Sequence, residues 1–295
     1  MGFSGLARWT NAPSTGLDLV TENIQHNYAG VVIGKWQLSI RSYRSTLGTI
    51  PGFQIPAERS MAALTMDNNV FVVLEDPMAP TRADFLQHVA TLDPSQPVPD
   101  PSHYRSTFLT LRPPGALEQL LAQLKAKWVS SRQSAPDTSQ RGSSSGSQVR
   151  IEGRIFSIGS DWIVRAGTVL LGGGTNSTKG MLLEAEYRPL PVLHSQTADS
   201  ASELLSNLLT AILPNVRDAK IVAVTISDSQ WEEVLWDREQ EEDNIEDKQE
   251  EIVDDIFVSG DQDLPVQRKG DWIGLERDRR SAFLIIGALR SEGIF

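Results

Sequence analysis

The sequence contains no cysteine among its 295 residues. Disulfide bonds, thiolate zinc sites and cysteine nucleophiles are therefore excluded for this chain. It also lacks the run of about 20 apolar residues that a membrane helix requires, because the longest late apolar segment, Ala282–Leu289, is too short. The first residues reach Thr10, Asn11 and Pro13 before an apolar run typical of a signal peptide develops. We therefore expect a soluble intracellular protein that does not contact a membrane.

Positive charge is scarce as well, and the excess of negative charge is local. The net charge is −11, but residues 239–255 hold ten acidic residues and one lysine, which leaves −2 for the rest of the chain. A basic surface that would bind nucleic acid is absent. We predict that residues 238–263 form an acidic disordered loop, because their few apolar side chains cannot offset the entropy cost of ordering. Contact of this loop with a basic partner is the alternative.

Motifs that carry catalysis are also missing. The four histidines occur in unrelated contexts, without a His-x-x-x-His pair or a carboxylate at ligand spacing, so we interpret each as an ordinary surface or packed side chain. These are His26, His88, His103 and His194. No Gly-x-Ser-x-Gly turn presents a serine nucleophile. The sequence thus predicts no catalytic residue, no cofactor site and no metal site.

A glycine-rich segment, Gly172–Gly174 followed by Thr178 and Lys179, resembles a phosphate-binding loop at first sight. The order Thr-Lys-Gly is the reverse of the Lys-Ser/Thr order that a phosphate loop requires. The residues after it, Met181–Tyr187, alternate as in a half-buried strand and do not begin a helix. Residues 162–171 before it also have strand composition. We predict a hairpin.

Periodicity along the chain predicts a mixture of strands and helices. The predicted class is α+β, with a mainly antiparallel, β-barrel-like sheet and flanking helices. Residues 1–295 are expected to form one barrel-like domain, interrupted by a flexible serine-rich insert at 131–149 and by the acidic loop. Helices are predicted at 15–28, 113–128, 200–212 and 277–289, and strands at 31–43, 60–66, 70–75, 104–111, 150–156, 162–171 and 181–187. Residues 219–226 are ambiguous.

Two of the predicted strands carry alternating charges. Glu184, Glu186 and Arg188 share one face of a strand, and residues 150–154 repeat the pattern with Arg150 and its neighbours. Inside a closed barrel, such residues could hold a divalent metal and a triphosphate, as in the triphosphate-tunnel hydrolases that this pattern resembles. A charged solvent face of an antiparallel sheet explains the same pattern. A barrel that carries a small ligand is a third alternative.

Several segments together resemble a known family. They are Gly2–Leu6, Leu17–Tyr43 and Arg154–Val192, and the most specific part runs from Gly167–Val169 through Glu186–Tyr187. In these segments the chain resembles the Mediator of RNA polymerase II transcription subunit 20 family. A leucine-rich helix at 204–212 follows in the family's order, and the tail at 279–290 is similar to fungal members.

The resemblance implies a barrel-like fold with flanking helices and no enzymatic activity or cofactor. It further implies a non-catalytic subunit of the Mediator head module, which acts in the nucleus as a transcriptional coregulator of RNA polymerase II. Its expected partners are Mediator subunit 18, as a direct heterodimer, and subunit 8, through a tethering helix. The rest of the head and RNA polymerase II would be contacted indirectly, and nucleic acid not directly.

Overall fold

The computed structural model describes residues 3–46, 58–91, 101–123, 128–130, 148–172, 177–188, 199–214, 221–224 and 274–295. Within these ranges ten strands form one sheet, and five helices accompany it. The strands are β1 (Phe3–Trp9), β2 (Val31–Ser45), β3 (Ser60–Met66), β4 (Asn69–Glu75), β5 (Ser106–Leu111), β6 (Trp128–Ser130), β7 (Gln148–Ile158), β8 (Trp162–Gly172), β9 (Ser177–Tyr187) and β10 (Ile221–Val224). The helices are α1 (Gly16–Asn27), α2 (Arg82–Thr91), α3 (Ala116–Gln123), α4 (Asp199–Ala211) and α7 (Gly274–Ser291).

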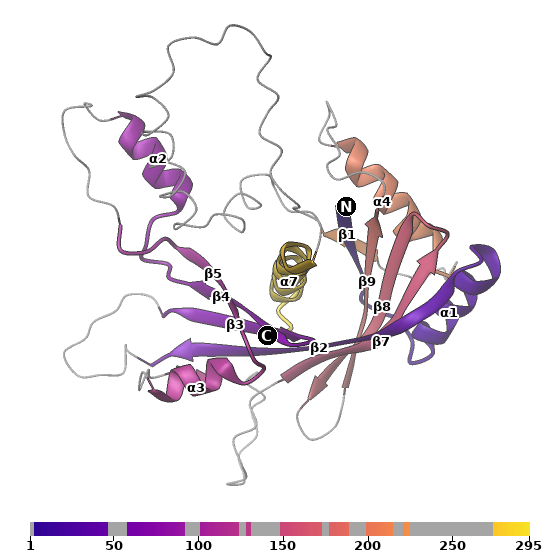
Figure 1. Cartoon of the computed structure of the whole chain (residues 1–295), viewed down its shortest axis with the longest axis horizontal. Helices are drawn as coiled ribbons and strands as arrows, with labels where there is room; N and C mark the ends of the chain where they lie inside the picture. Colours follow the sequence, from indigo (N-terminus) through magenta and orange to yellow (C-terminus); the bar gives the residue numbers. More distant parts are fainter. Residues whose placement is uncertain are drawn as a thin grey trace, which may run out of the picture.

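The sheet is antiparallel at every pairing and runs in the order β10-β1-β9-β8-β7-β2-β3-β4-β5, with β6 paired to one end of β2. The predicted α+β class with a mainly antiparallel sheet is confirmed. Among the described residues β5 and β10 do not pair with each other, so the sheet curves like a barrel without closing. Figure 1 shows it bent around α7, the yellow helix on its concave side.

The concave face holds the largest group of buried apolar residues. Because neighbouring strand residues point to opposite faces, Ala62 and Leu64 of β3 belong to this group, whereas Met61 and Ala63 do not. Helix α7 contributes Ile285, among other residues, to the same group, and it contacts β1, β3 and β4. The last helix of the described chain therefore fills the space that the sheet encloses.

The convex face is covered by α1, α3 and α4. Helices α1 and α4 pack there against β1, β8 and β9, with Val20, Ile24 and Leu209 buried beside Trp9. Helix α3 buries Leu117 near Tyr43 of β2 in a separate apolar group. Figure 1 shows α1 and α4 outside the curve of the sheet, opposite α7. Both faces of the sheet are consequently buried over much of its area.

One pair of glycines explains how closely β7 and β8 approach. Gly153 lies directly opposite Gly167, and a Cβ on Gly153 would stand 1.9 Å from the carbonyl oxygen of Ala166. A Cβ on Gly167 would stand 3.1 Å from Cε3 of Trp36 on β2. Both positions favour glycine, because a Cβ on Gly153 would collide with backbone and a Cβ on Gly167 would stand 2.7 Å from Cγ2 of Ile151.

Most predicted elements agree with the structure. The glycine-rich segment joins β8 to β9 in an antiparallel hairpin, as expected, while residues 173–176 lie outside the described ranges. Residues 221–224 of the ambiguous segment form β10. Strands β1 and β6 and helix α2 were not predicted. The helix predicted at 113–128 was too long, because α3 is Ala116–Gln123 and Trp128 belongs to β6.

Helix α2 nevertheless has a start signal in the sequence. The amide of Asp84 donates to Oγ1 of Thr81 at 3.0 Å, and the amide of Thr81 donates to Oδ2 of Asp84 at 3.3 Å. This reciprocal pair is a capping box with aspartate in the acidic position. By contrast, Thr15 precedes α1 without a side-chain capping bond.

Some predictions fall outside the described residues. The serine-rich insert does so except for Gln148 and Val149, which already belong to β7. The acidic loop at 238–263 does so completely, as does His194. None of the described helices is long and apolar enough to cross a membrane.

Candidate functional site

The two glutamates singled out from the sequence lie on β9, on the concave face of the sheet. Glu184 is 1% exposed and Glu186 8% exposed. Arg165 stands directly opposite Glu184 on β8, and its guanidinium donates to Glu184 Oε2 at 3.2 Å and to Glu186 Oε2 at 2.9 Å. Arg277 of α7 donates to Glu186 Oε2 at 3.3 Å and also pairs with Asp278. The tertiary structure thus joins residues of two strands and one helix in a buried ion cluster.

This ion cluster contains three carboxylates and two guanidiniums, so it is short of positive charge. Burial raises the pKa of Asp278, and the nearby Glu184 adds to the shift although Arg277 and Arg165 oppose it. Burial alone would lower the pKa of Arg277, but Glu184, Asp278 and Glu186 raise it above its ordinary value. The protonation states of Asp278 and Arg277 therefore depend on the charged groups beside them.

The arrangement favours a structural role for the cluster. In a triphosphate tunnel, arginines must be free for phosphate and carboxylates free for a metal. Here Arg165 and Arg277 are engaged by the carboxylates, and α7 lies against them on the concave face. Across the described ranges no group of three His, Cys, Asp or Glu side chains is placed to hold a metal ion. Helix α7 also occupies the place that a carrier barrel would give to a small ligand.

The second charged segment, residues 150–154, faces the opposite way. Arg150 and Glu152 are exposed, and Arg154 donates to Thr21 Oγ1 of α1 at 2.8 Å and meets Asp18 Oδ1 at 3.4 Å. The interpretation that both charged strands line one interior is therefore wrong. The pattern on β7 is a solvent face, as the alternative interpretation held, whereas the pattern on β9 is interior.

Sequence reasoning also missed Arg8 on β1, a buried charge outside the ion cluster that is 1% exposed. Its guanidinium donates to Glu292 Oε2 at 3.0 Å and to the backbone oxygens of Met181 and Lys179, both at 2.8 Å. Arg8 thereby ties β1 and β9 to the residue that follows α7. The available signal was the period of two, since Leu6 and Arg8 share a face that Leu6 marks as buried.

The histidines described by the structure have no common site. His103 Nε2 lies 2.9 Å from Oδ2 of Asp76, a partner that sequence spacing did not reveal, and Arg59 pairs with the same carboxylate. Burial alone would raise the pKa of Asp76, but the His103 hydrogen bond, the Met78 amide and Arg59 together hold it below the ordinary value. His88 lies on the exposed helix α2.

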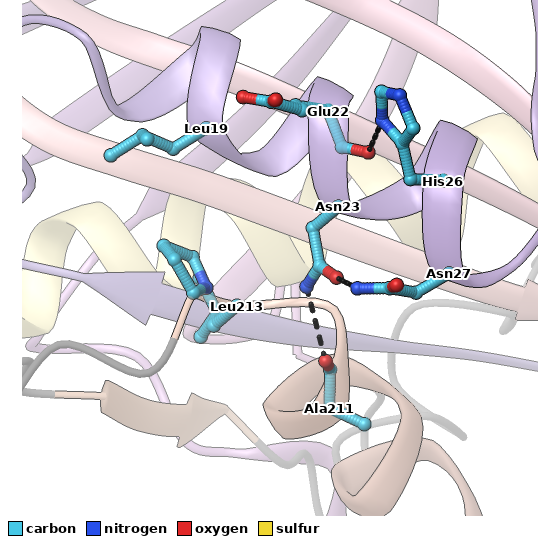
Figure 2. A pocket seen from close by; sticks show the side chains of 8 residues that line it. Leu19, Glu22, Asn23, His26, Asn27, Ala211 and Leu213 are labelled. Carbon is cyan, nitrogen blue, oxygen red and sulfur yellow. Dashed lines mark hydrogen bonds between the residues drawn. The ribbon is translucent and has the colours of Figure 1, made fainter.

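His26 lines an open groove of about 510 Å³ between α1 and the end of α4. Figure 2 shows Asn23 in the groove, donating through Nδ2 to the backbone oxygen of Ala211; a second bond reaches Ile212 at 2.7 Å. His26 Nδ1 donates to the backbone oxygen of Glu22, since a carbonyl can only accept. The two bonds of Asn23 cap the end of α4 and dock it on α1, which is a packing role, whereas the bond of His26 stays within α1.

Comparison with known protein families identifies the family of this chain. The sequence profile of the family described as Med20, TATA-binding related factor (TRF) of subunit 20 of Mediator complex, matches residues 1–235. A comparison with curated proteins gives no match.

Three solved structures are similar in outline. The Schizosaccharomyces pombe Mediator head module contains a chain that is 11% identical, with 75% of this chain and 100% of that chain covered and a TM-score of 0.33. HpAC1 from Hippeastrum, described as having a dominant triphosphatase activity, is 9% identical, with 74% and 93% covered and a TM-score of 0.34. The PH1819 protein from Pyrococcus horikoshii OT3 is 10% identical, with 71% and 88% covered and a TM-score of 0.32. At these scores the likenesses carry no functional argument.

Proposed function

The chain belongs to the family of subunit 20 of the Mediator complex, and from this premise we propose that it is a non-catalytic subunit of the Mediator head module. As a Mediator subunit it acts in transcription and has other Mediator subunits as partners. We expect it in the nucleus, where it would regulate RNA polymerase II through protein–protein contacts, without cofactor and without direct contact to nucleic acid.

The observation that carries the proposal is the profile match over residues 1–235, which includes all ten strands. The buried ion cluster supports the non-catalytic part. Its two arginines are engaged by carboxylates, and the bond from Arg277 to Glu186 attaches α7 to the sheet, as expected of groups in a core. Two further buried charges, Arg8 and Asp76, also form ion pairs within the fold.

We further propose that subunit 18 is the direct partner, and that subunit 8 attaches to the pair through a helix. The test is co-expression of the full chain with subunit 18 from the same source, followed by size-exclusion chromatography with mass detection. We expect a stable one-to-one complex. The chain expressed alone is the control, and we expect it to be less soluble. A chain that stays monomeric beside subunit 18 would contradict the heterodimer.

A further inference from the structure

Strand β2 has a free edge at its N-terminal end. Residues 31–41 of β2 pair with β7 on one side, but pairing with β3 on the other side begins only at Leu38. Residues 31–37 therefore offer the backbone donors and acceptors of alternate residues to a further strand over roughly 20 Å. None of these seven residues has another described partner on that side. We call this segment the β2 edge.

The β2 edge carries exposed apolar side chains. Val31, Val32 and Ile33 are 62%, 41% and 56% exposed, which makes them three consecutive β-branched residues open to solvent. The register of β2 shifts between Val32 and Gly34, so Ile33 is an extra residue in the ladder with β7. Strand edges are normally blunted by charge, proline or a bulge. The β2 edge has the bulge and Lys35, but it also exposes three adjacent apolar side chains, which is typical of a surface that binds a partner.

The positive charge of Lys35 indicates which kind of strand can pair with the β2 edge. Lys35 is exposed and stands directly opposite Arg154 on β7, and no carboxylate among the described residues forms an ion pair with Lys35. Like charges in direct cross-strand contact are destabilising. A second copy of this chain paired at the same edge would add another lysine and arginine to this surface. A strand with an acidic residue beside Lys35 would instead balance the charge.

We propose that the β2 edge binds an extended strand of a partner protein, which adds to the sheet with an acidic residue facing Lys35 and apolar residues against Val31 and Ile33. This inference rests on the proposed function, because subunit 18 is the partner to be tested. The added strand would lie in line with β3 and end near the turn at Asp67 that joins β3 to β4. Main-chain bonds would give affinity, and the Lys35 pair would give register and selectivity.

Hydrogen exchange of the full chain, alone and in the co-expressed complex with subunit 18, tests the site directly. In the lone chain, we expect the amides of residues 31–37 that point away from β7 to exchange rapidly. In the complex they should be protected, while amides of exposed α2 stay unchanged. Protection already present in the lone chain would overturn the proposal, because the edge would then be occupied by this chain or by a second copy.

Charge reversal gives the second test. We expect Lys35→Glu to weaken the complex with subunit 18 about tenfold, with a smaller loss in high salt. The lone variant should be at least as thermostable as the parent, because the new carboxylate would face Arg154. Lys179→Glu is the matched control: it is an exposed lysine of the same sheet, on β9, separated from β2 by β7 and β8, and binding should not change.

The two proposals fail in different ways. A stable complex in which residues 31–37 remain unprotected, and in which Lys35→Glu binds as tightly as the parent, would overturn the β2 edge and leave the heterodimer intact. Absence of any complex with subunit 18 would overturn both.

Discussion

At the scale of single residues, buried ion pairs connect distant parts of the chain in the interior of this protein. Arg8, Arg165 and Glu184 are each at most 8% exposed, and each has an ion-pair partner from another element. Burying an unpaired charge is costly, so removing one partner leaves a penalty on the other. The pairs on the convex face are more exposed and should matter less, because solvent screens them.

The residue-scale prediction compares two such arginines. Arg8→Met should lower the free energy of unfolding by about 3–5 kcal/mol, because it leaves Glu292 without its partner and the oxygens of Met181 and Lys179 without a donor. Arg41→Met removes an ion pair with Glu118 in which both side chains are nearly half exposed, and should cost less than about 1 kcal/mol. Urea unfolding followed by fluorescence measures both. Equal effects of the two changes would contradict a structural role for Arg8.

At the scale of elements, helix α7 has one side that is buried against the curved sheet and another side that is exposed. Ile285 and its buried neighbours face the sheet, where Phe283 meets Phe108 of β5 at 5.9 Å between ring centres. Gly287 is exposed, and a Cβ there would have no atom within 4 Å. The charged residues at the two ends attach the helix, since Arg277 reaches Glu186 and Arg290 pairs with Glu75.

The element-scale prediction uses both sides of α7. Ile285→Ala should destabilise the fold by about 2–5 kcal/mol, because it opens a cavity in the largest apolar group. Gly287→Ala should stabilise it by about 0.5–1 kcal/mol, because alanine restricts the unfolded chain and meets nothing in the folded one. Thermal and urea unfolding of the two variants give the comparison. A neutral Ile285→Ala would show that α7 is not part of the stable core.

At the scale of the whole molecule, a helix covers the concave side of one curved sheet, and the two edge strands of that sheet do not pair. In the described ranges the end strands β5 and β10 remain unpaired with each other, and α7 bridges the concave space between β1 and β4. The interior therefore has the outline expected of a barrel but is filled with side chains.

The prediction at this scale concerns catalysis. We expect the purified chain to release no phosphate from tripolyphosphate in the presence of Mn²⁺, because Arg165 and Arg277 are bound to carboxylates and α7 fills the concave face. A colorimetric phosphate assay checks this. The double variant Glu184→Ala, Glu186→Ala is the control for contaminating activity. Phosphate release by the parent that disappears in a folded double variant would contradict the non-catalytic assignment.

The strands and most helices were predictable because their signals are local. Alternation at Met181–Tyr187, the reversed order of Thr178 and Lys179, and the apolar face around Ile285 are properties of neighbouring residues. β1 was missed although Leu6 and Arg8 alternate in the required way, because its seven residues include Gly5 and place the charged Arg8 on the face that Leu6 marks as buried. Helix α2 was missed because its apolar residues are not buried, so the usual periodicity is weak.

By itself, the sequence determined the α+β class, the hairpin at the glycine-rich segment, the absence of cysteine chemistry and, through its matched segments, the family. Only the tertiary structure decided which of the two charged strands faces inward. A period of two separates the faces of a strand, but it does not say which face another element covers. That depends on contacts between residues far apart in the chain, such as Arg8 and Glu292, and these form only when the sheet has curved around α7.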